Sequence, residues 1–303
     1  MPFYVSAEAL LADIRLRLEG SGVKSTALVV EGPDDKRLFY HRVSPTAHVV
    51  VAGGKTLLRS GLLSMLETDH GRILFLTDCD YDVRNGQLTG GPNVVITAGC
   101  DIEADLISLG VLDRLAVEIA PRAVETRGGA AKIGKDVREH AEKLCRALGR
   151  IRMASQPLGV DLCLDEWDFG KFWDRKTDAV LSDKLEQTAW SRLKSTGISR
   201  DQWHSLISDM PNDGSMCNGK DLVRASQLFF RAFYRMSNKI TAEIMAMMLR
   251  LALDDQQFDS WSVVHRIRKW EGFYGRDLLS GAGTWKMNNS QSEDCASARE
   301  TRD

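Results

Sequence analysis

The chain has 303 residues, of which 43% are hydrophobic and 27% are charged, and this content is sufficient for a substantial core. The formal net charge of −2 argues against a basic protein that coats nucleic acid, so a nucleic-acid partner has to bind at a local basic patch. No signal peptide is recognised, and no apolar run approaches the ~20 residues that a membrane-spanning helix needs. The six cysteines form no CxxC pair, so we expect reduced thiols in a soluble, cytoplasmic protein without a membrane partner.

The predicted elements of the first third of the chain alternate between strands and helices. In chain order they are a helix at 6–19 capped by Ser6, a strand ending at Glu31, a helix from Asp34, a strand at 49–51, a helix carrying Leu57 to Leu66, a strand at 73–77, a strand at 94–97 and a helix from Asp101 through Leu112. This alternation predicts an α/β fold with a mostly parallel, Rossmann-like sheet that is flanked by helices.

Helical periodicity replaces the strand pattern after about residue 125. Apolar residues repeat at helical spacing over 133–151, 180–193 and 222–233. The run 244–253 is unusually apolar and rich in methionine, which is typical of a buried central helix or of a partner surface. We therefore expect three parts: an α/β domain with an N-terminal helix at 1–125, an α-helical domain for oligomerisation or substrate binding at 126–285, and a disordered polar tail at 286–303.

Carboxylates follow two of the predicted strands. Glu31 ends the first strand and Asp35 follows it closely, while Asp78, Asp80 and Asp82 follow the strand at 73–77. The carboxyl ends of parallel strands share one edge of a sheet, and carboxylates gathered there repel one another unless a cation lies between them. Hard divalent cations such as Mg²⁺ prefer oxygen ligands. The pattern favours a metal site for phosphate chemistry, although Asp78 and Asp80 alone are also typical of a loop.

Two further segments have a structural and a functional interpretation. Asp101 is well placed to cap a helix, while Glu103 is a candidate for a second metal or a water. Gly53, Gly54 and Lys55 form either a simple turn or a site for a substrate phosphate. They do not form an ATP-binding loop, because Val49 occupies the position where that motif requires glycine.

Two groups of basic residues suit either a solvated helix face or an RNA backbone. The first surrounds Gly128 and Gly129, and the second surrounds Trp270 and Tyr274. Their members are Arg122, Arg127, Lys132, Lys135 and Arg138 in the first group and His265, Arg266, Arg268, Lys269 and Arg276 in the second.

The carboxylate motifs resemble those of the TOPRIM domain, the nucleotidyl-transfer and hydrolysis fold of topoisomerases, bacterial primases and overcoming-lysogenization-defect (OLD) nucleases. In that family a glutamate follows the first strand and a DxD or DxDxD motif follows the third, and the resemblance covers residues 25–115. It implies a nuclease that depends on Mg²⁺ or Mn²⁺. The implied metal ligands are Glu31, Asp78, Asp80 and Asp82; the implied catalytic residues add Asp35, Lys55 and Glu103; and the implied substrate contacts are Gly53, Gly54, Lys55, Arg127 and Lys132.

Segments 31–37, 53–55, 101–103 and 168–172 resemble a defence-associated TOPRIM branch that includes the AriB-type effectors of the PARIS anti-phage system. In that branch an AriA-like ABC-type ATPase holds the TOPRIM subunit until a phage protein triggers its release, and the freed nuclease cuts host tRNA. The resemblance implies these partners, and we expect the helical half to supply a homodimer surface. Segment 218–221 departs from the branch, because asparagine stands where a histidine is expected before the aspartate.

Three other functions remain open at this point. An OLD-like DNA nuclease would use the same carboxylates. A TOPRIM subunit could serve as a non-catalytic sensor or assembly module. The sequence from Phe75 to Asp80 also resembles the nucleophile strand of haloacid-dehalogenase-like phosphatases, but that fold normally places the motif on its first strand and does not explain Glu31.

Overall fold

The computed structural model describes residues 4–81, 90–194 and 197–281, and it divides into two compact units. Of the described residues, the first unit contains 4–77, 90–96 and 258–281, and the second contains 78–81, 97–194 and 197–257. This division differs from the expected ranges 1–125 and 126–285, because the chain enters the second unit directly after a strand and later returns to the first. The expected tail at 286–303 lies outside the described residues.

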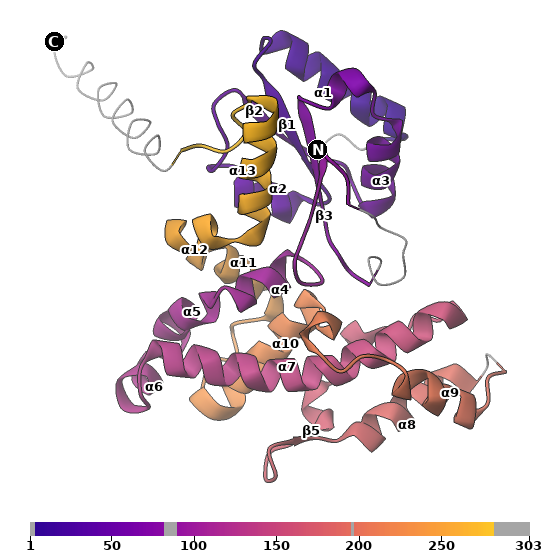
Figure 1. Ribbon diagram of the computed structural model, residues 1–303. Coiled ribbons are helices and arrows are strands. Elements are labelled where there is room, and N and C mark those ends of the chain that lie inside the picture. The colour runs from indigo at the N-terminus through magenta and orange to yellow at the C-terminus, as the bar shows by residue number, and fades with distance from the viewer. Residues whose placement is uncertain (1–3, 82–89, 195–196, 282–303) are drawn as a thin grey trace, which may run out of the picture. The chain divides into compact units, whose positions relative to one another are not determined.

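The first unit contains a four-stranded parallel sheet in the order β2-β1-β3-β4 (Figure 1). The expected parallel sheet flanked by helices is therefore confirmed. Every residue of β1 and of β3 is buried, which explains their continuous apolar sequences, since a parallel sheet is covered on both faces. The strands are β1 (Thr26–Val30), β2 (Ala47–Val51), β3 (Ile73–Thr77) and β4 (Val94–Ile96).

Helices α1 and α3 lie on one side of this sheet, and α2 and α13 lie on the other (Figure 1). The core under α1 and α3 includes Leu10, Ile14 and Leu58 together with Val29 and Phe75 of the strands. As expected, Ser6 caps α1, and its hydroxyl accepts a hydrogen bond from the Ala9 amide. The helices are α1 (Ala7–Gly20), α2 (Pro33–Phe39), α3 (Lys55–Ser64) and α13 (Ser262–Tyr274).

Helix α13 belongs to the first unit although it lies far along the chain from the sheet. Trp261, just before α13, stacks on Phe39 of α2 with ring centroids 5.9 Å apart. Trp270 of α13 donates a hydrogen bond from Nε1 to Asn93 Oδ1, just before β4, at 2.9 Å. These aromatic contacts with the N-terminal third complete the second face of the sheet, which sequence periodicity alone did not assign to this helix.

The second unit consists of helices around α7, with a short hairpin of β5 and β6 (Figure 1). The single helix expected from Asp101 through Leu112 is two helices, because Gly110 adopts a left-handed conformation (φ 80°) between them. The elements are α4 (Ile102–Ser108), α5 (Val111–Ile119), α6 (Pro121–Thr126), α7 (Ala130–Ser155), β5 (Trp173–Asp174), β6 (Ala179–Val180), α8 (Ser182–Leu193), α9 (Arg200–Ser208), α10 (Gly219–Tyr234) and α11 (Ala242–Ala252), followed by α12 (Asp255–Ser260), within which the chain returns to the first unit.

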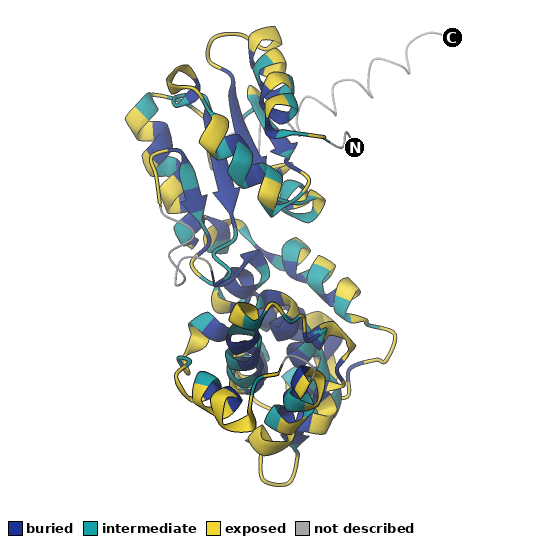
Figure 2. Ribbon diagram, turned by 90° about the vertical axis from the view of Figure 1, so that its right-hand side faces the viewer, coloured by how far each residue is buried: buried dark blue, intermediate teal, exposed yellow. Residues whose placement is uncertain are grey.

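Helix α11 is not buried all round. Met245 and Leu249 are fully buried, whereas Met247 and Leu251 are 48% and 78% exposed. The mixture of buried and exposed faces is visible throughout the second unit in Figure 2. In the part of the chain that the structure describes, neither α11 nor any other helix has both the length and the apolar content needed to span a membrane.

Candidate functional site

The ends of β1 and β3 carry the first carboxylates of the predicted site. Val29 pairs with Phe75 in the parallel register, so the same register continued by two residues brings Glu31 level with Thr77, the last residue of β3. Asp78 is the next residue along the chain. Glu31 belongs to the first unit, whereas Asp78 and Asp80 belong to the second.

In the first unit, two turns fix the backbone at Glu31. The Glu31 carbonyl accepts hydrogen bonds from the amides of Gly53 and Gly54 at 3.3 and 3.2 Å. These two glycines have φ angles of 91° and 128°, a region that other residues rarely adopt, and α3 begins directly after them at Lys55. Asp35 stabilises the other turn, because its Oδ2 accepts a hydrogen bond from the Gly32 amide at 2.8 Å. Asp35 thus has a capping role at the start of α2.

In the second unit, the segment that carries Asp78 and Asp80 is held by the residues that follow β4. The Cys79 amide donates to Thr97 Oγ1 at 2.9 Å, and the Asp80 amide donates to the Cys100 carbonyl at 2.7 Å. Asp80 has a left-handed backbone (φ 44°), which aspartate tolerates better than most residues. The buried Tyr81 hydroxyl donates to the Met216 carbonyl at 3.1 Å. The loop is therefore anchored on both sides of Asp80, while Asp82 lies outside the described residues.

Asp101 connects the N-termini of two helices. Its Oδ1 accepts from the Ala104 amide of α4 at 2.9 Å, and its Oδ2 accepts from the Gly219 amide of α10 at 2.8 Å. The residue is only 6% exposed, and burial, followed by the nearby charge of Glu103, raises its pKa to about 7. A Cβ on Gly219 would lie 1.8 Å from the Asp101 carboxylate, so the α10 terminus approaches this closely only with glycine there. The predicted cap at Asp101 is confirmed.

Glu103 forms an ion pair with Arg250 of α11. Its Oε1 lies 3.0 Å from Arg250 Nη1, and both side chains are largely buried, at 19% and 11% exposure. Arg250 was not identified from the sequence, because 147 residues separate the two and no spacing rule links them. The arrangement places a guanidinium next to a carboxylate that was predicted to bind a metal or a water.

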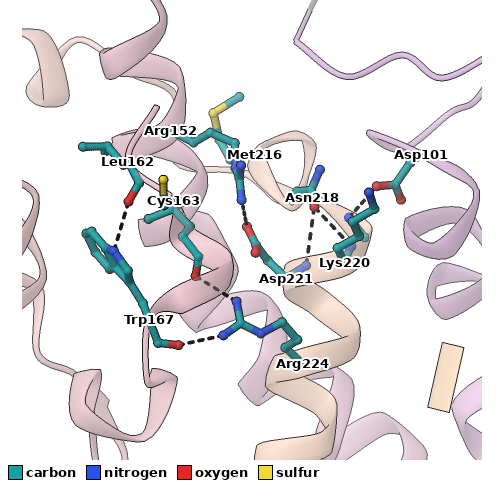
Figure 3. Close-up of polar contacts among 12 residues, drawn as sticks. Asp101, Arg152, Leu162, Cys163, Trp167, Met216, Asn218, Lys220, Asp221 and Arg224 are labelled. Carbon is teal, nitrogen blue, oxygen red and sulfur yellow. Dashed lines mark hydrogen bonds and ion pairs between the residues drawn. The ribbon is translucent and has the colours of Figure 1, made fainter. Parts of the chain in front are cut away.

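The segment 218–221, which departs from the TOPRIM branch that the sequence resembles, begins helix α10 (Figure 3). Asn218 Oδ1 accepts from the amides of Lys220 and Asp221 at 3.1 and 3.4 Å. Asp221 is 3% exposed and forms an ion pair with Arg152 at 2.8 Å. Asn218 therefore caps α10, and Asp221 is the buried ion-pair partner of Arg152.

The segment 168–172 also forms a turn in the second unit. Asp168 Oδ1 accepts from the Gly170 amide at 3.1 Å, and Phe169 and Phe172 are buried. Arg224 packs over the Phe169 ring at 4.1 Å and donates to the Leu164 carbonyl. It also donates to the Trp167 carbonyl (Figure 3). The aromatic residues of this segment belong to the core of the unit.

The two basic groups differ in their contacts. In the second group, Arg266, Arg268 and Arg276 donate to backbone carbonyls of their own unit, which gives them a structural role. In the first group, Lys132 Nζ lies 3.9 Å from Asp136 Oδ2, and Lys135 Nζ lies 3.8 Å from Glu139 Oε1. Both are weak ion pairs on the surface. Arg122 and Arg127 line an open cavity at the C-terminal end of α10.

Among the described residues, no group of three or more Asp, Glu, His or Cys side chains is arranged so that it could hold a metal ion. No protein-family profile and no curated protein matches the chain.

Proposed function

We propose that the chain is a metal-dependent nuclease of the TOPRIM type, with Glu31, Asp78 and Asp80 as ligands of Mg²⁺ or Mn²⁺. One observation carries the proposal: Glu31 and Asp78 are the residues next to the carboxyl ends of β1 and β3, which are parallel neighbours in one sheet. This edge is where α/β folds bind their ligands. An all-oxygen donor set of this kind suits a hard divalent cation.

Such a cation would offset the charge of a phosphodiester and lower the pKa of a bound water. Lys55 would then neutralise a non-bridging phosphate oxygen, assisted by the amides of Gly53 and Gly54. Asp35 would act as a positioning residue, because its hydrogen bond to the Gly32 amide fixes the turn after Glu31. Glu103, held by Arg250, would orient a water. In hydrolysis, water adds to phosphorus, one P–O bond breaks, and the leaving oxygen takes up a proton.

Within this proposal the chain is the toxic effector of an anti-phage defence system, cleaving host tRNA as a homodimer after release from an ABC-type ATPase by a phage trigger. The support is the sequence resemblance of segments 31–37, 53–55 and 101–103. Segments 168–172 and 218–221 add little to it, since the structure explains their residues by caps and core packing.

The phosphatase alternative is less consistent with the strand order. Its nucleophile motif would lie on β3, the third strand along the chain, and Glu31 would have no function. The DNA-nuclease and non-catalytic alternatives use the same residues, so only the reaction distinguishes them.

Cleavage by the purified chain tests the proposal. In Mg²⁺, wild type should cut tRNA, and Asp78→Asn should lower the rate by at least ~100-fold because a metal ligand is lost. Asp34→Asn is the matched control, because Asp34 pairs with Arg37 on the surface of α2 and should leave the rate unchanged. EDTA should abolish cleavage by wild type.

Other outcomes separate the alternatives. Cleavage of DNA but not of tRNA would favour the OLD-like nuclease. Release of phosphate from a phosphomonoester without any strand cleavage would favour the phosphatase. If neither nucleic acid nor phosphomonoester reacts, the non-catalytic function is the better account.

A further inference from the structure

The second unit contains a positively charged cavity that no residue of the proposed metal site lines. It has a volume of about 500 Å³ and lies between α6 and the C-terminal end of α10, and its size is within the range of small-molecule sites. Three arginines and two aromatic residues line it, and the lining contains no aspartate or glutamate. These five are Arg122, Arg127, Arg235, Phe233 and Tyr234.

The three guanidinium groups have no carboxylate partner among the described residues. Arg127 donates from Nη1 to the Phe233 carbonyl at 2.9 Å, and this one contact helps to cap α10. The side chains of Arg122 and Arg235 make no hydrogen bond within the described ranges, and all three arginines are exposed. Three like charges around one hollow raise the local concentration of anions.

The aromatic rings of Phe233 and Tyr234 line the cavity beside the charges. The Arg127 guanidinium lies 5.9 Å from the centre of the Tyr234 ring. The Tyr234 hydroxyl donates to Asp136 at 3.1 Å, so its position is fixed from outside the cavity. Burial and the nearby Asp136 carboxylate raise the pKa of Tyr234 to about 12, and the cavity keeps its positive charge at neutral pH.

Arg235 occupies an unusual backbone position for an arginine. It ends α10 with a left-handed conformation (φ 58°), where glycine is the common residue. Arginine is thus present at a position where helix capping alone would favour glycine, and its side chain lines the cavity.

We propose that this cavity binds one nucleotide unit, with the phosphate among Arg122, Arg127 and Arg235 and the base against Tyr234. Arginine and aromatic side chains together recognise an unstacked base with its phosphate. The unit belongs either to a free nucleotide or to a single strand. That the bound nucleotide belongs to the strand that is cleaved rests on the proposed function. The binding of a nucleotide in this cavity does not depend on that function.

Fluorescence anisotropy with labelled oligouridylate and the full chain in EDTA measures binding without cleavage. Arg235→Gly should weaken binding about tenfold and reduce the slope of log K against log salt by ~0.7, the value for one lost phosphate contact on a single strand. The variant should fold, since glycine suits the left-handed position. Tyr234→Leu should weaken binding with little change in slope, because stacking releases no counterions. Arg200→Ala on α9, which does not line the cavity, is the charge-matched control and should bind as wild type.

Competition identifies the source of the nucleotide. Displacement of the strand by equimolar UMP supports a free nucleotide as ligand, and resistance to UMP supports a strand. Displacement by inorganic phosphate as efficient as by UMP would overturn the base contact. Absence of binding by wild type, or wild-type affinity and slope in Arg235→Gly, would overturn the site. Retained binding without cleavage in Mg²⁺ would count against the proposed nuclease alone.

Discussion

Asp101 shows how a single carboxylate can link helices while remaining costly to ionise. Both of its oxygens accept amide hydrogen bonds, from Ala104 and from Gly219, which favours the charged form. Burial and the charge of Glu103 outweigh them, so the pKa rises to about 7. The sequence identified the cap at Asp101, but not its second bond, because nothing in the local pattern relates Asp101 to a glycine 118 residues later.

This pKa gives a pH dependence of stability. The folded state holds the Asp101 proton more tightly than the unfolded chain does, so this group lowers the free energy of unfolding as pH rises from about 4 to about 7. In Asp101→Asn this decrease should be absent. The difference in the free energy of unfolding between the variant and wild type should therefore change by no more than ~4 kcal/mol across this pH interval. Urea unfolding in EDTA over this pH range measures it.

The control for this experiment is Asp183→Asn, an exposed position on α8, which should show the wild-type pH profile. If Asp101→Asn also follows wild type across the interval, burial does not raise the pKa of this carboxylate and the account of Asp101 is wrong.

Helix α7 shows what a helical pattern predicts and what it leaves out. Its apolar residues, such as Ile133, Leu144 and Ile151, are fully buried, as their spacing indicates. Gly149 within the helix looks unfavourable by propensity alone, yet a Cβ there would lie 1.8 Å from the Met216 carbonyl. The close approach of the segment at 214–216 explains this glycine, and it depends on a tertiary contact that no local pattern encodes.

Substitutions of helical glycines test this explanation. Gly149→Ala should lower the free energy of unfolding by ~1–3 kcal/mol, since the added methyl group forces the backbone at Met216 to move. Gly272→Ala in α13, where a Cβ meets open space, should instead raise it by up to ~1 kcal/mol through helix propensity. Chemical denaturation of both variants measures the contrast. Equal stabilisation by both changes would show that Gly149 is not a packing requirement.

The elements that were predicted well are those whose signals are local. The strands of the sheet follow from apolar runs of strand length, and α1 follows from its cap and one apolar face. The break between α4 and α5 was not predicted, and it falls at Gly110, which adopts a left-handed conformation. For the run 244–253 the sequence left a buried helix and a partner surface open, because composition alone does not say which methionines face the core.

At the scale of the whole molecule, neither compact unit is one continuous stretch of the chain. The chain enters the second unit at Asp78 and returns to the first within α12, where α13 completes the sheet. Glu31 follows β1 within the first unit, and Asp78 is the first residue of the second unit along the chain. The motifs were found from sequence because each one follows a strand directly. The charged cavity was not found as a whole, because Arg235 and Tyr234 lie about 110 residues from Arg122 and Arg127.

Metal affinity tests the central claim, that one cation is bound by Glu31 and Asp78 together. Titration with Mn²⁺, followed by calorimetry, should show binding by wild type that weakens at least ~10-fold in Glu31→Gln and in Asp78→Asn. Because both carboxylates would act on one ion, each single variant should weaken the same binding event, and the double variant should bind more weakly than either single variant. No Mn²⁺ binding by wild type, or wild-type affinity in either single variant, would contradict the account.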